Sequence, residues 1–581
     1  MSDKKPFGSQ PHFPQDVTGM YVLAQALQKC GLTHMFGLCG IPVTDLAYLC
    51  QEYGVRYFGF RFEQQAGMAA ATYGYLTKKP GLLLTVSSLG FLNGLTATIN
   101  ATVNCYPMIQ ISGSSQREPV DMDQGAYEQL DQFAVAKPLV KAAFRCNDPK
   151  DLPSAVARAW RAAVSGRPGG VYLDVVESCL GQVIPHDQIA DWFIEPVDPC
   201  PAMPPSEASV KRAMELLASA KRPAFLFGKG AAYAQIDDKI KQLVEKTGIP
   251  YFPMSMAKGL LPDDHPLSAL SCRSTIMEEA DVVVLMGARL NWLLSRGHGK
   301  WSKTVKFIQL DIDPLEMDRN RKIDAPVVGD LDSSVTAMLN ALPSYKLQMD
   351  PAWVKKLQDE TKVKNQKFAE RLAAHAKDMP MTHWAALAAI KPIMKEHPDI
   401  VLINEGANTL DDTRDTLDQY KPRCRVDCAT WAIMGMGMGS CVGAAVATGR
   451  SVVAIEGDSA FGFSGMDFAT IARFNLPVTV IVFNNGGIYN GIGVNLSKNP
   501  TDDKDPAPTT LDINARYDKI GECFGAQSYY VKTPDELSKA LRESIASKKP
   551  CFINVQLAAD SGVESGHIGY LNPESLQHPL A

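Results

Sequence analysis

An aspartate and an asparagine stand at positions that predict a divalent-metal site. Asp458 closely follows a continuous apolar run at residues 452–455, and Asn485 follows a second run at 477–483. A segment of helical length, 464–474, lies between them. This pattern predicts two buried parallel strands joined by a right-handed crossover, so both polar residues should emerge at the same carboxyl edge of a sheet.

Magnesium prefers oxygen ligands. The Asp458 carboxylate, the Asn485 amide oxygen and the Gly487 carbonyl would fill three of about six octahedral positions, leaving the others to phosphate oxygens and water. Gly457 and Gly486 allow a ligand to approach the backbone closely. From spacing alone, an ordinary buried strand–helix–strand unit with an Asn-Asn-Gly turn explains these residues equally well.

The paired motifs Gly457-Asp458 and Asn484-Asn485 resemble the diphosphate anchor of thiamine-diphosphate (ThDP) enzymes. The wording GDSAFGFSGM, followed by NNGGIY, is similar to the oxalyl-CoA decarboxylases and the related 2-hydroxyacyl-CoA lyases. The resemblance covers essentially the whole chain and implies ThDP and Mg²⁺ as cofactors. It also implies three parallel-sheet α/β domains of the ThDP decarboxylase type. Cofactor contacts are expected from Ser459, Ala460, Ile488 and Tyr489.

Glu63, in FRFEQQAGMAA, begins a predicted helix, where an acidic residue usually serves only the helix dipole. By resemblance, it is the glutamate that hydrogen-bonds the aminopyrimidine ring and promotes loss of the thiazolium C2 proton. The chain departs from the family pattern at four positions, where the family has His or Asn, Pro, Tyr and Gly: Phe62, Leu89, His383 and Ala432.

The resemblance implies further site residues, each of which alone is more often a surface or packing residue. Cofactor contacts are expected from Gly406, Ala407, Asn408, Ala432 and Met434, with Met434 as the apolar wedge that keeps ThDP folded. Candidates for positioning substrate and handling its proton are Tyr127, Glu128, Tyr489 and Ser565. CoA contacts are expected from Met256, Ala257, Lys258, Arg414, Glu564, Ser565 and Gly566. ADP, a possible effector, is expected at Arg167, Lys229, Arg289 and Asp311.

The bulk composition describes an ordinary globular protein. At 581 residues the chain is too long to fold around a single hydrophobic core, so we expect several domains. Its 46% hydrophobic and 21% charged residues are typical of soluble domains. A net charge of −5 gives no reason to expect nucleic acid, and the sequence has no apolar run near membrane-spanning length. The 13 scattered cysteines and the polar start favour a reduced, cytoplasmic setting without a signal peptide.

Alternating helical patterns and apolar runs predict the domain organisation. We expect a pyrimidine-binding domain at 1–190, a middle domain with the possible ADP site at 206–345, and a diphosphate- and Mg-binding domain at 375–560. The linker at 193–209 contains five prolines, and 346–376 looks like a helical connector. The tail, 561–581, is a possible active-site lid.

The expected reaction is decarboxylation of oxalyl-CoA to formyl-CoA and carbon dioxide, in a homodimer or homotetramer implied by the resemblance. A 2-hydroxyacyl-CoA lyase, which releases formyl-CoA and an aldehyde, is the first alternative. A catalytically silent ThDP- or nucleotide-binding homologue is the second, suggested by the four departures. A flavin-dependent acetohydroxyacid synthase is more distant. The ESG at 564–566 favours the decarboxylase over the lyase.

Overall fold

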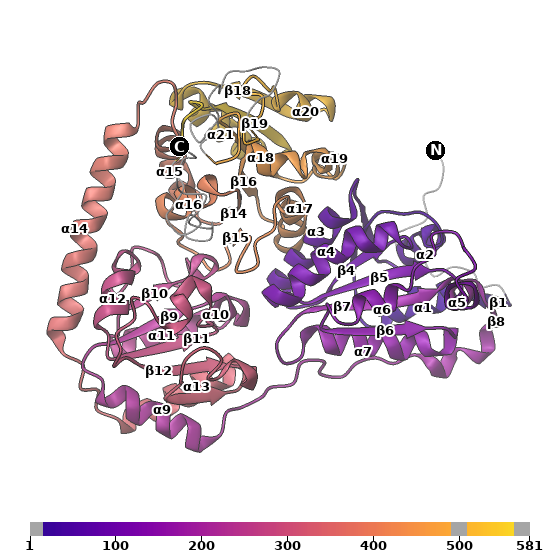
Figure 1. Ribbon diagram of the computed structural model, residues 1–581, viewed down its shortest axis with the longest axis horizontal. Coiled ribbons are helices and arrows are strands. Elements are labelled where there is room, and N and C mark those ends of the chain that lie inside the picture. Colours follow the sequence, from indigo (N-terminus) through magenta and orange to yellow (C-terminus); the bar gives the residue numbers. More distant parts are fainter. Residues whose placement is uncertain (1–14, 490–507, 563–581) are drawn as a thin grey trace, which may run out of the picture. The chain divides into compact units, whose positions relative to one another are not determined.

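The computed structural model describes residues 15–489 and 508–562 of the chain (Figure 1). They form two compact units. The first contains the described residues up to Pro201, together with Thr430–Gly449 and Phe463–Leu476. The second contains Ala202–Ala429, Arg450–Gly462 and the described residues from Pro477 onward. The large sheets are parallel and combined with helices, which confirms the predicted α/β class. In the part of the chain that the structure describes, no helix is both long and apolar enough to span a membrane.

The first unit is built on a six-stranded sheet of order β3-β2-β4-β5-β7-β6, in which every pairing is parallel. Its strands are β2 (His34–Gly37), β3 (Arg56–Gly59), β4 (Gly81–Thr85), β5 (Met108–Ser114), β6 (Ala142–Cys146) and β7 (Gly170–Val176). The short strands β1 (Asp16–Thr18) and β8 (Val183–Pro185) pair antiparallel. The longer helices are α1 (Gly19–Lys29), α2 (Thr44–Glu52), α3 (Glu63–Thr77), α4 (Leu89–Asn104) and α7 (Leu152–Val164).

Helix α17 (Gly437–Thr448) also belongs to the first unit and packs closely against α3. A Cβ added at Gly439 would lie 2.2 Å from the Gln65 carbonyl oxygen, and one at Gly443 would lie 2.4 Å from that of Ala69. The small residues of both helices therefore bring the two backbones into contact. This contact places the Gly-rich segment before α17 beside the start of α3.

The second unit contains two parallel sheets. The five-stranded sheet has the order β10-β9-β11-β12-β13, and the six-stranded sheet has the order β15-β14-β16-β17-β19-β18. The first is formed by β9 (Pro223–Phe227), β10 (Tyr251–Pro253), β11 (Val282–Met286), β12 (Lys306–Asp311) and β13 (Ala325–Val328). The second is formed by β14 (Val401–Glu405), β15 (Arg425–Asp427), β16 (Val452–Gly457), β17 (Val478–Asn484), β18 (Gln527–Val531) and β19 (Cys551–Gln556).

Helices complete the second unit. They include α9 (Glu207–Ser219), α10 (Lys229–Ala234), α11 (Asp237–Thr247), α12 (Arg273–Glu279), α13 (Leu331–Ala341), α15 (His383–Glu396), α16 (Asn408–Thr416), α20 (Asp518–Cys523) and α21 (Pro534–Ser547). The predicted helical connector is α14 (Pro351–His375), a long rod in Figure 1 that leads from the five-stranded sheet to the six-stranded one. The domain boundaries given above stay a prediction.

The predicted crossover helix between β16 and β17 is shorter than expected. The segment 464–474 forms a 3₁₀ turn, Gly465–Asp467, and then the short helix α19 (Phe468–Arg473). The two flanking strands are parallel neighbours, as predicted. Their carboxyl ends therefore meet at one edge of the six-stranded sheet.

Candidate active site

The edge where β16 and β17 end brings together the residues predicted to bind metal. Asp458 begins the short helix α18 (Asp458–Gly462) and is 2% exposed. Its Oδ1 accepts a hydrogen bond from the Ser459 N–H at 2.7 Å, and its Oδ2 accepts from the N–H groups of Gly486 and Gly487 at 2.8 and 3.1 Å. The pKa of Asp458 is raised to about 6 by burial, and the hydrogen bonds from these backbone donors partly offset that rise. The carboxylate is thus held in place by the turn that follows β17.

Asn485 is oriented by its own amide hydrogens. Its Nδ2 donates to the carbonyl oxygens of Tyr489 at 2.9 Å and Ser561 at 3.1 Å. With both hydrogens committed, Oδ1 is the end of the amide that can bind a cation. A single carboxylate beside an amide oxygen is the hard-oxygen set that Mg²⁺ prefers. No group of three or more His, Cys, Asp or Glu residues suited to a metal occurs among the described residues.

Asn408, at the start of α16, fits the expected role in holding an organic cofactor. It is 3% exposed, and neither of its side-chain amide atoms has a hydrogen-bond partner among the described residues. Gly406, with φ of +116°, turns the chain just before it. Buried amides are normally hydrogen-bonded, so a bound polar ligand is the natural partner for Asn408. The residues present therefore fit ThDP at this edge.

His383, one of the four departures, is buried beside Asn408. Its Nδ1 lies 2.8 Å from Ser561 Oγ, which also accepts the backbone N–H of His383 at 2.8 Å. A Cβ added at Gly562 would lie 2.7 Å from Asn408 Nδ2 and 3.2 Å from His383 Cε1. Burial lowers the pKa of His383 to about 4, so the imidazole is neutral at physiological pH. The change from Tyr to His thus adds no charge to the site.

Two buried glutamates that the sequence analysis did not single out precede the predicted cofactor and metal residues at 406–408 and 458–460. Glu405 ends β14 and Glu456 lies near the end of β16, and the two are register partners, both fully buried. Neither carboxylate oxygen of Glu456 has a hydrogen-bond partner in the described part of the chain. Burial, together with the Glu405 charge, holds the pKa of Glu456 well above its ordinary value. An acidic residue inside an apolar strand, as in VVAIEG, is the signal that would have found it.

Glu63 lies in the first unit, as the first residue of α3, and is 5% exposed. Its Oε2 accepts a hydrogen bond from Asn93 Nδ2 at 3.1 Å, and a Cβ added at Gly90 would lie 3.0 Å from its Oε1. Both contacts come from the first turns of α4. Asn93, which the sequence analysis quoted only within GFLNG, therefore orients the key carboxyl group.

Glu128 also contacts the start of α4. Its Oε2 accepts a hydrogen bond from Ser87 Oγ at 2.6 Å, and its carbonyl oxygen accepts from Ser88 Oγ. Both Ser88 and Glu128 have positive φ, +40° and +47°, which non-glycine residues rarely adopt. The Tyr127 side chain is 71% exposed. Glu63 and Glu128 are thus brought to the same helix start, with Leu89 exposed as the first residue of α4.

Met434 is 38% exposed in the chain, and its carbonyl oxygen accepts a hydrogen bond from Gln64 Nε2 at 3.3 Å. The neighbouring Gln65 donates to the Gly435 carbonyl and accepts from the Gly439 N–H at 3.0 Å. The segment that carries Ala432 and Met434 is therefore fastened to the residues just after Glu63. Sequence reasoning missed Gln64 and Gln65, although both stand in the quoted FRFEQQ motif.

Three of the predicted ADP residues share one edge of the five-stranded sheet. Lys229 follows β9, Arg289 follows β11, and Asp311 ends β12. A Cβ added at Gly228 would lie 2.1 Å from the Gly287 carbonyl oxygen, so the two turns are in backbone contact. Arg167 lies in the first unit. This edge can present two cations and a carboxylate to a nucleotide.

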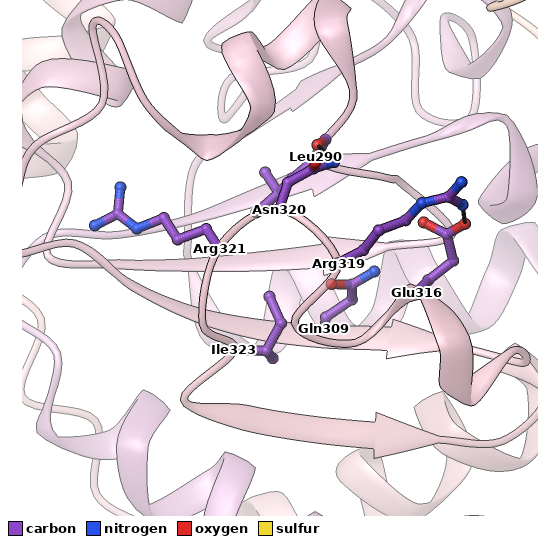
Figure 2. Close-up of a pocket in the computed structure, with 7 residues that line it drawn as sticks. All are labelled: Leu290, Gln309, Glu316, Arg319, Asn320, Arg321 and Ile323. Atoms are coloured by element: carbon purple, nitrogen blue, oxygen red, sulfur yellow. Dashed lines mark hydrogen bonds and ion pairs between the residues drawn. The ribbon is translucent and has the colours of Figure 1, made fainter.

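A pocket beside β12 is too small for such a ligand. It is lined by Leu290, Gln309, Glu316, Arg319, Asn320, Arg321 and Ile323 (Figure 2). Its volume of about 10 Å³ suits one water molecule. Arg321 points away from the other lining side chains in Figure 2 and donates to the Gly297 carbonyl at 2.5 Å. This pocket is therefore no candidate for the active site.

The predicted CoA segment is largely committed to packing. Met256 and Ala257 are buried, and Lys258 is 3% exposed. Lys258 Nζ donates to the carbonyl oxygens of Arg414 at 2.7 Å and Leu417 at 3.1 Å, and it pairs with Asp263 at 3.3 Å. The Arg414 guanidinium pairs with Asp411 and Asp415. The predicted CoA residues Glu564, Ser565 and Gly566, of which Ser565 is also a proton-handling candidate, lie outside the described residues, as does most of the tail.

Comparison with known proteins shows that the chain belongs to the thiamine pyrophosphate (ThDP) enzymes. Residues 17–135, 210–338 and 410–555 match the N-terminal, central and C-terminal domain models of thiamine pyrophosphate (ThDP) enzymes. The chain is 51% identical to an oxalyl-CoA decarboxylase of Escherichia coli K12, covering 97% of this chain and 99% of that protein. It is 43% identical to a 2-hydroxyacyl-CoA lyase of Arabidopsis thaliana, over 96% of this chain and 99% of that protein. It is 36% identical to 2-hydroxyacyl-CoA lyase 1 of Homo sapiens, over 94% of this chain and 95% of that protein.

Proposed function

Because the chain belongs to the thiamine-diphosphate-dependent enzymes, we propose that it decarboxylates oxalyl-CoA to formyl-CoA and carbon dioxide. The observation that carries the substrate assignment is the 51% identity with the E. coli oxalyl-CoA decarboxylase along almost the whole of both chains. The lyases are 43% identical or less among those compared, and they align with almost the whole of this chain. They make 2-hydroxyacyl-CoA cleavage the competing activity.

Asp458, Asn485 and the Gly487 carbonyl are the proposed Mg²⁺ ligands. Asp458 contributes the negative charge, and the backbone donors that hold it are neutral and leave that charge intact. Asn485 contributes Oδ1, because Tyr489 and Ser561 engage its Nδ2. Ser459, Ala460, Ile488 and Tyr489 follow these ligands directly in the chain and are the proposed diphosphate and ring contacts, together with Gly406, Ala407 and Asn408.

ThDP, when bound, supplies the electron sink that decarboxylation requires. The contribution of the chain is to hold the cofactor and to move protons. Glu63 is the proposed proton-transfer residue, because its buried carboxyl group is held at one oxygen by Asn93, a neutral donor. Glu128, anchored by Ser87, and Tyr127 are proposed to position the substrate. Met434 and Ala432 are the proposed apolar contacts of the cofactor.

The test is a product analysis by chromatography of acyl-CoA species. The purified protein with ThDP and Mg²⁺ is incubated with oxalyl-CoA in one sample and with a 2-hydroxyacyl-CoA in another. The proposal predicts formyl-CoA and carbon dioxide from the first and a much lower kcat/KM for the second. An aldehyde from the second sample, with no product from the first, would assign the chain to the lyases. Silence in both would favour the non-catalytic homologue.

ADP is proposed as an effector bound by Lys229, Arg289 and Asp311, with Arg167 assigned by resemblance alone. Their support is their shared sheet edge and the suitability of two cations for phosphates and of a carboxylate for ribose hydroxyls. Titration calorimetry with ADP should show binding that Asp311→Asn weakens. We also propose a cytoplasmic homo-oligomer, a dimer or a tetramer, which light scattering of the purified protein distinguishes.

A further inference from the structure

The turn that leads into Glu63 is held by side chains from the segment Phe463–Leu476 of the same unit. Strand β3 ends at Gly59 and α3 begins at Glu63, so residues 60–62 form the connection. Thr470 Oγ1 donates to the Gly59 carbonyl at 2.8 Å. The Asp467 carboxylate accepts the N–H of Arg61 at 2.6 Å and also that of Phe62. Both ends of the turn are therefore tied to one short segment.

Asp467 is 2% exposed, although an aspartate is one of the residues least often buried. Burying a carboxyl group is costly unless hydrogen bonds replace its water, and here the two backbone N–H groups do so. The pKa of Asp467 is raised to about 7, mainly by burial and also by the Glu63 charge. The two N–H donors and the Arg61 charge act in the opposite direction. Asp467 and Glu63 are therefore close enough to interact electrostatically.

The N-cap residue of α3 makes no side-chain hydrogen bond that could hold the start of the helix. The N-cap residue, Phe62, has extended backbone angles (φ −144°, ψ +130°) and a side chain that cannot accept a hydrogen bond. The support comes instead from Asp467, 406 positions after Arg61. Asp467 stands in the sequence GFSGMDF, which follows Asp458, the proposed metal ligand. The residue that fixes the turn before Glu63 therefore lies directly after the quoted GDSAFGFSGM motif in the sequence.

We propose that Asp467 is a positioning residue for Glu63. It acts through the backbone of Arg61 and Phe62, which sets where the Cα of Glu63 lies and where its carboxyl group points. Proton transfer requires hydrogen-bond geometry between donor and acceptor, and a displacement of about 1 Å costs on the order of 10²-fold in rate. This inference rests on the proposed function, since the placement of Glu63 matters only if Glu63 exchanges a proton with bound ThDP.

The experiment compares wild-type protein with Asp467→Ala and Asp467→Asn, the latter keeping one acceptor oxygen and the shape of the side chain. Asp518→Asn is the matched control, because Asp518 is also buried, at 1% exposure, and is bound instead to Arg516 and Asn554. Glu63→Gln is the reference for loss of the proton-transfer group. Three quantities are measured: hydrogen–deuterium exchange of the Arg61 and Phe62 amides in cofactor-free protein, the dissociation constant of ThDP, and the exchange rate of the ThDP C2 proton without substrate.

We expect Asp467→Ala to speed amide exchange at Arg61 and Phe62 and to slow C2-proton exchange on the order of 10²-fold, with little change in ThDP affinity. Asp467→Asn should give intermediate values, and Asp518→Asn should match wild type in both exchange measurements. If the alanine variant does not fold, the asparagine variant decides. Two results for the Asp467 variants would overturn this inference but leave the proposed function standing. One is unchanged amide exchange at Arg61 and Phe62, and the other is faster amide exchange with C2-proton exchange at the wild-type rate. A wild-type C2-exchange rate in Glu63→Gln would overturn the proposed role of Glu63, and the inference with it.

Discussion

Two buried carboxylates, one in each unit, receive hydrogen bonds from neutral donors. Glu63 accepts from the Asn93 amide, and Asp458 accepts from three backbone N–H groups. Such donors orient a carboxylate without cancelling its charge, whereas a buried lysine partner, as Asp263 has in Lys258, neutralises it. Glu63 is thereby suited to transferring a proton, and Asp458 to binding a divalent cation.

His383 should make the folded protein sensitive to acid. Its pKa is about 4 in the folded chain against an ordinary value of 6.5, so the unfolded chain binds the proton more tightly. Its contribution to stability is therefore complete above about pH 6.5 and is lost as the pH falls towards 4, by on the order of 2–3 kcal/mol. Melting temperatures measured from pH 7 to pH 4 should fall more steeply for wild type than for His383→Asn. Parallel curves would contradict a neutral buried histidine.

The sequence pointed to Glu63, Asp458 and Asn485 because each stands in a short motif at the end of a strand-like run. It did not point to Asn93 as a partner of Glu63, or to Ser561 as a partner of His383. Those hydrogen bonds join residues 30 and 178 positions apart, and no local pattern specifies them. The roles assigned to all these residues remain predictions until variants are measured.

Helices α3 and α17 of the first unit are in backbone contact because small residues line both surfaces. Glycines 439 and 443 lie one helical turn apart, and an added Cβ at either would overlap the backbone of α3. The contact matters for the site because α3 begins with Glu63 and α17 follows the segment of Met434. The close approach of the two helices therefore depends on glycine at these two positions.

Gly443→Ala should therefore destabilise the protein, although alanine is the better helix former. Its Cβ would lie 2.4 Å from the Ala69 carbonyl oxygen, and we expect a loss of about 1–3 kcal/mol from overpacking. Gly181→Ala is the matched control in the same unit, since an added Cβ there has nothing within 4 Å. Denaturant unfolding of both variants measures the difference. Equal stabilities would show that α3 and α17 are not in backbone contact.

The central strands were predictable and several edge strands were not. Runs such as 282–286 and 478–483 are continuous and apolar because those strands are covered on both faces. The edge strands β6 and β18 contain partly exposed positions, and β15 is only three residues long with two charged side chains. Edge positions therefore lack the apolar run by which a buried strand is recognised. The crossover helix was overestimated because glycine and proline bound a segment that is only partly helical.

Charged side chains join the two sheets of the second unit, and of these the sequence analysis named only Lys258, as a CoA contact. Lys258 follows the five-stranded sheet at β10 and donates to carbonyls near the end of α16. Arg423, just before β15, makes a bidentate pair with Asp237 of α11 at 2.8 and 2.6 Å. Charged side chains therefore contribute to the contact between these two sheets.

Lys258→Met should lower stability rather than only weaken CoA binding. Both partners of the Lys258–Asp263 pair are 3% exposed, and removing one leaves the other buried without its partner, at a cost of about 3–5 kcal/mol. Lys421→Met, which breaks an exposed pair with Asp399, should cost less than about 1 kcal/mol. Adding Asp263→Leu to Lys258→Met should recover part of the loss. A fully stable Lys258→Met with a raised KM for the CoA substrate would favour the phosphate-binding role instead.

The most direct test of the whole account is a reconstitution assay. The protein is freed of cofactors by dialysis against a chelator, and formyl-CoA formation from oxalyl-CoA is measured as ThDP and Mg²⁺ are added back singly and together. The account predicts product only when both are present, with kcat reduced by several orders of magnitude in Glu63→Gln. Formyl-CoA at full rate without ThDP, or no formyl-CoA with both cofactors present, would contradict it.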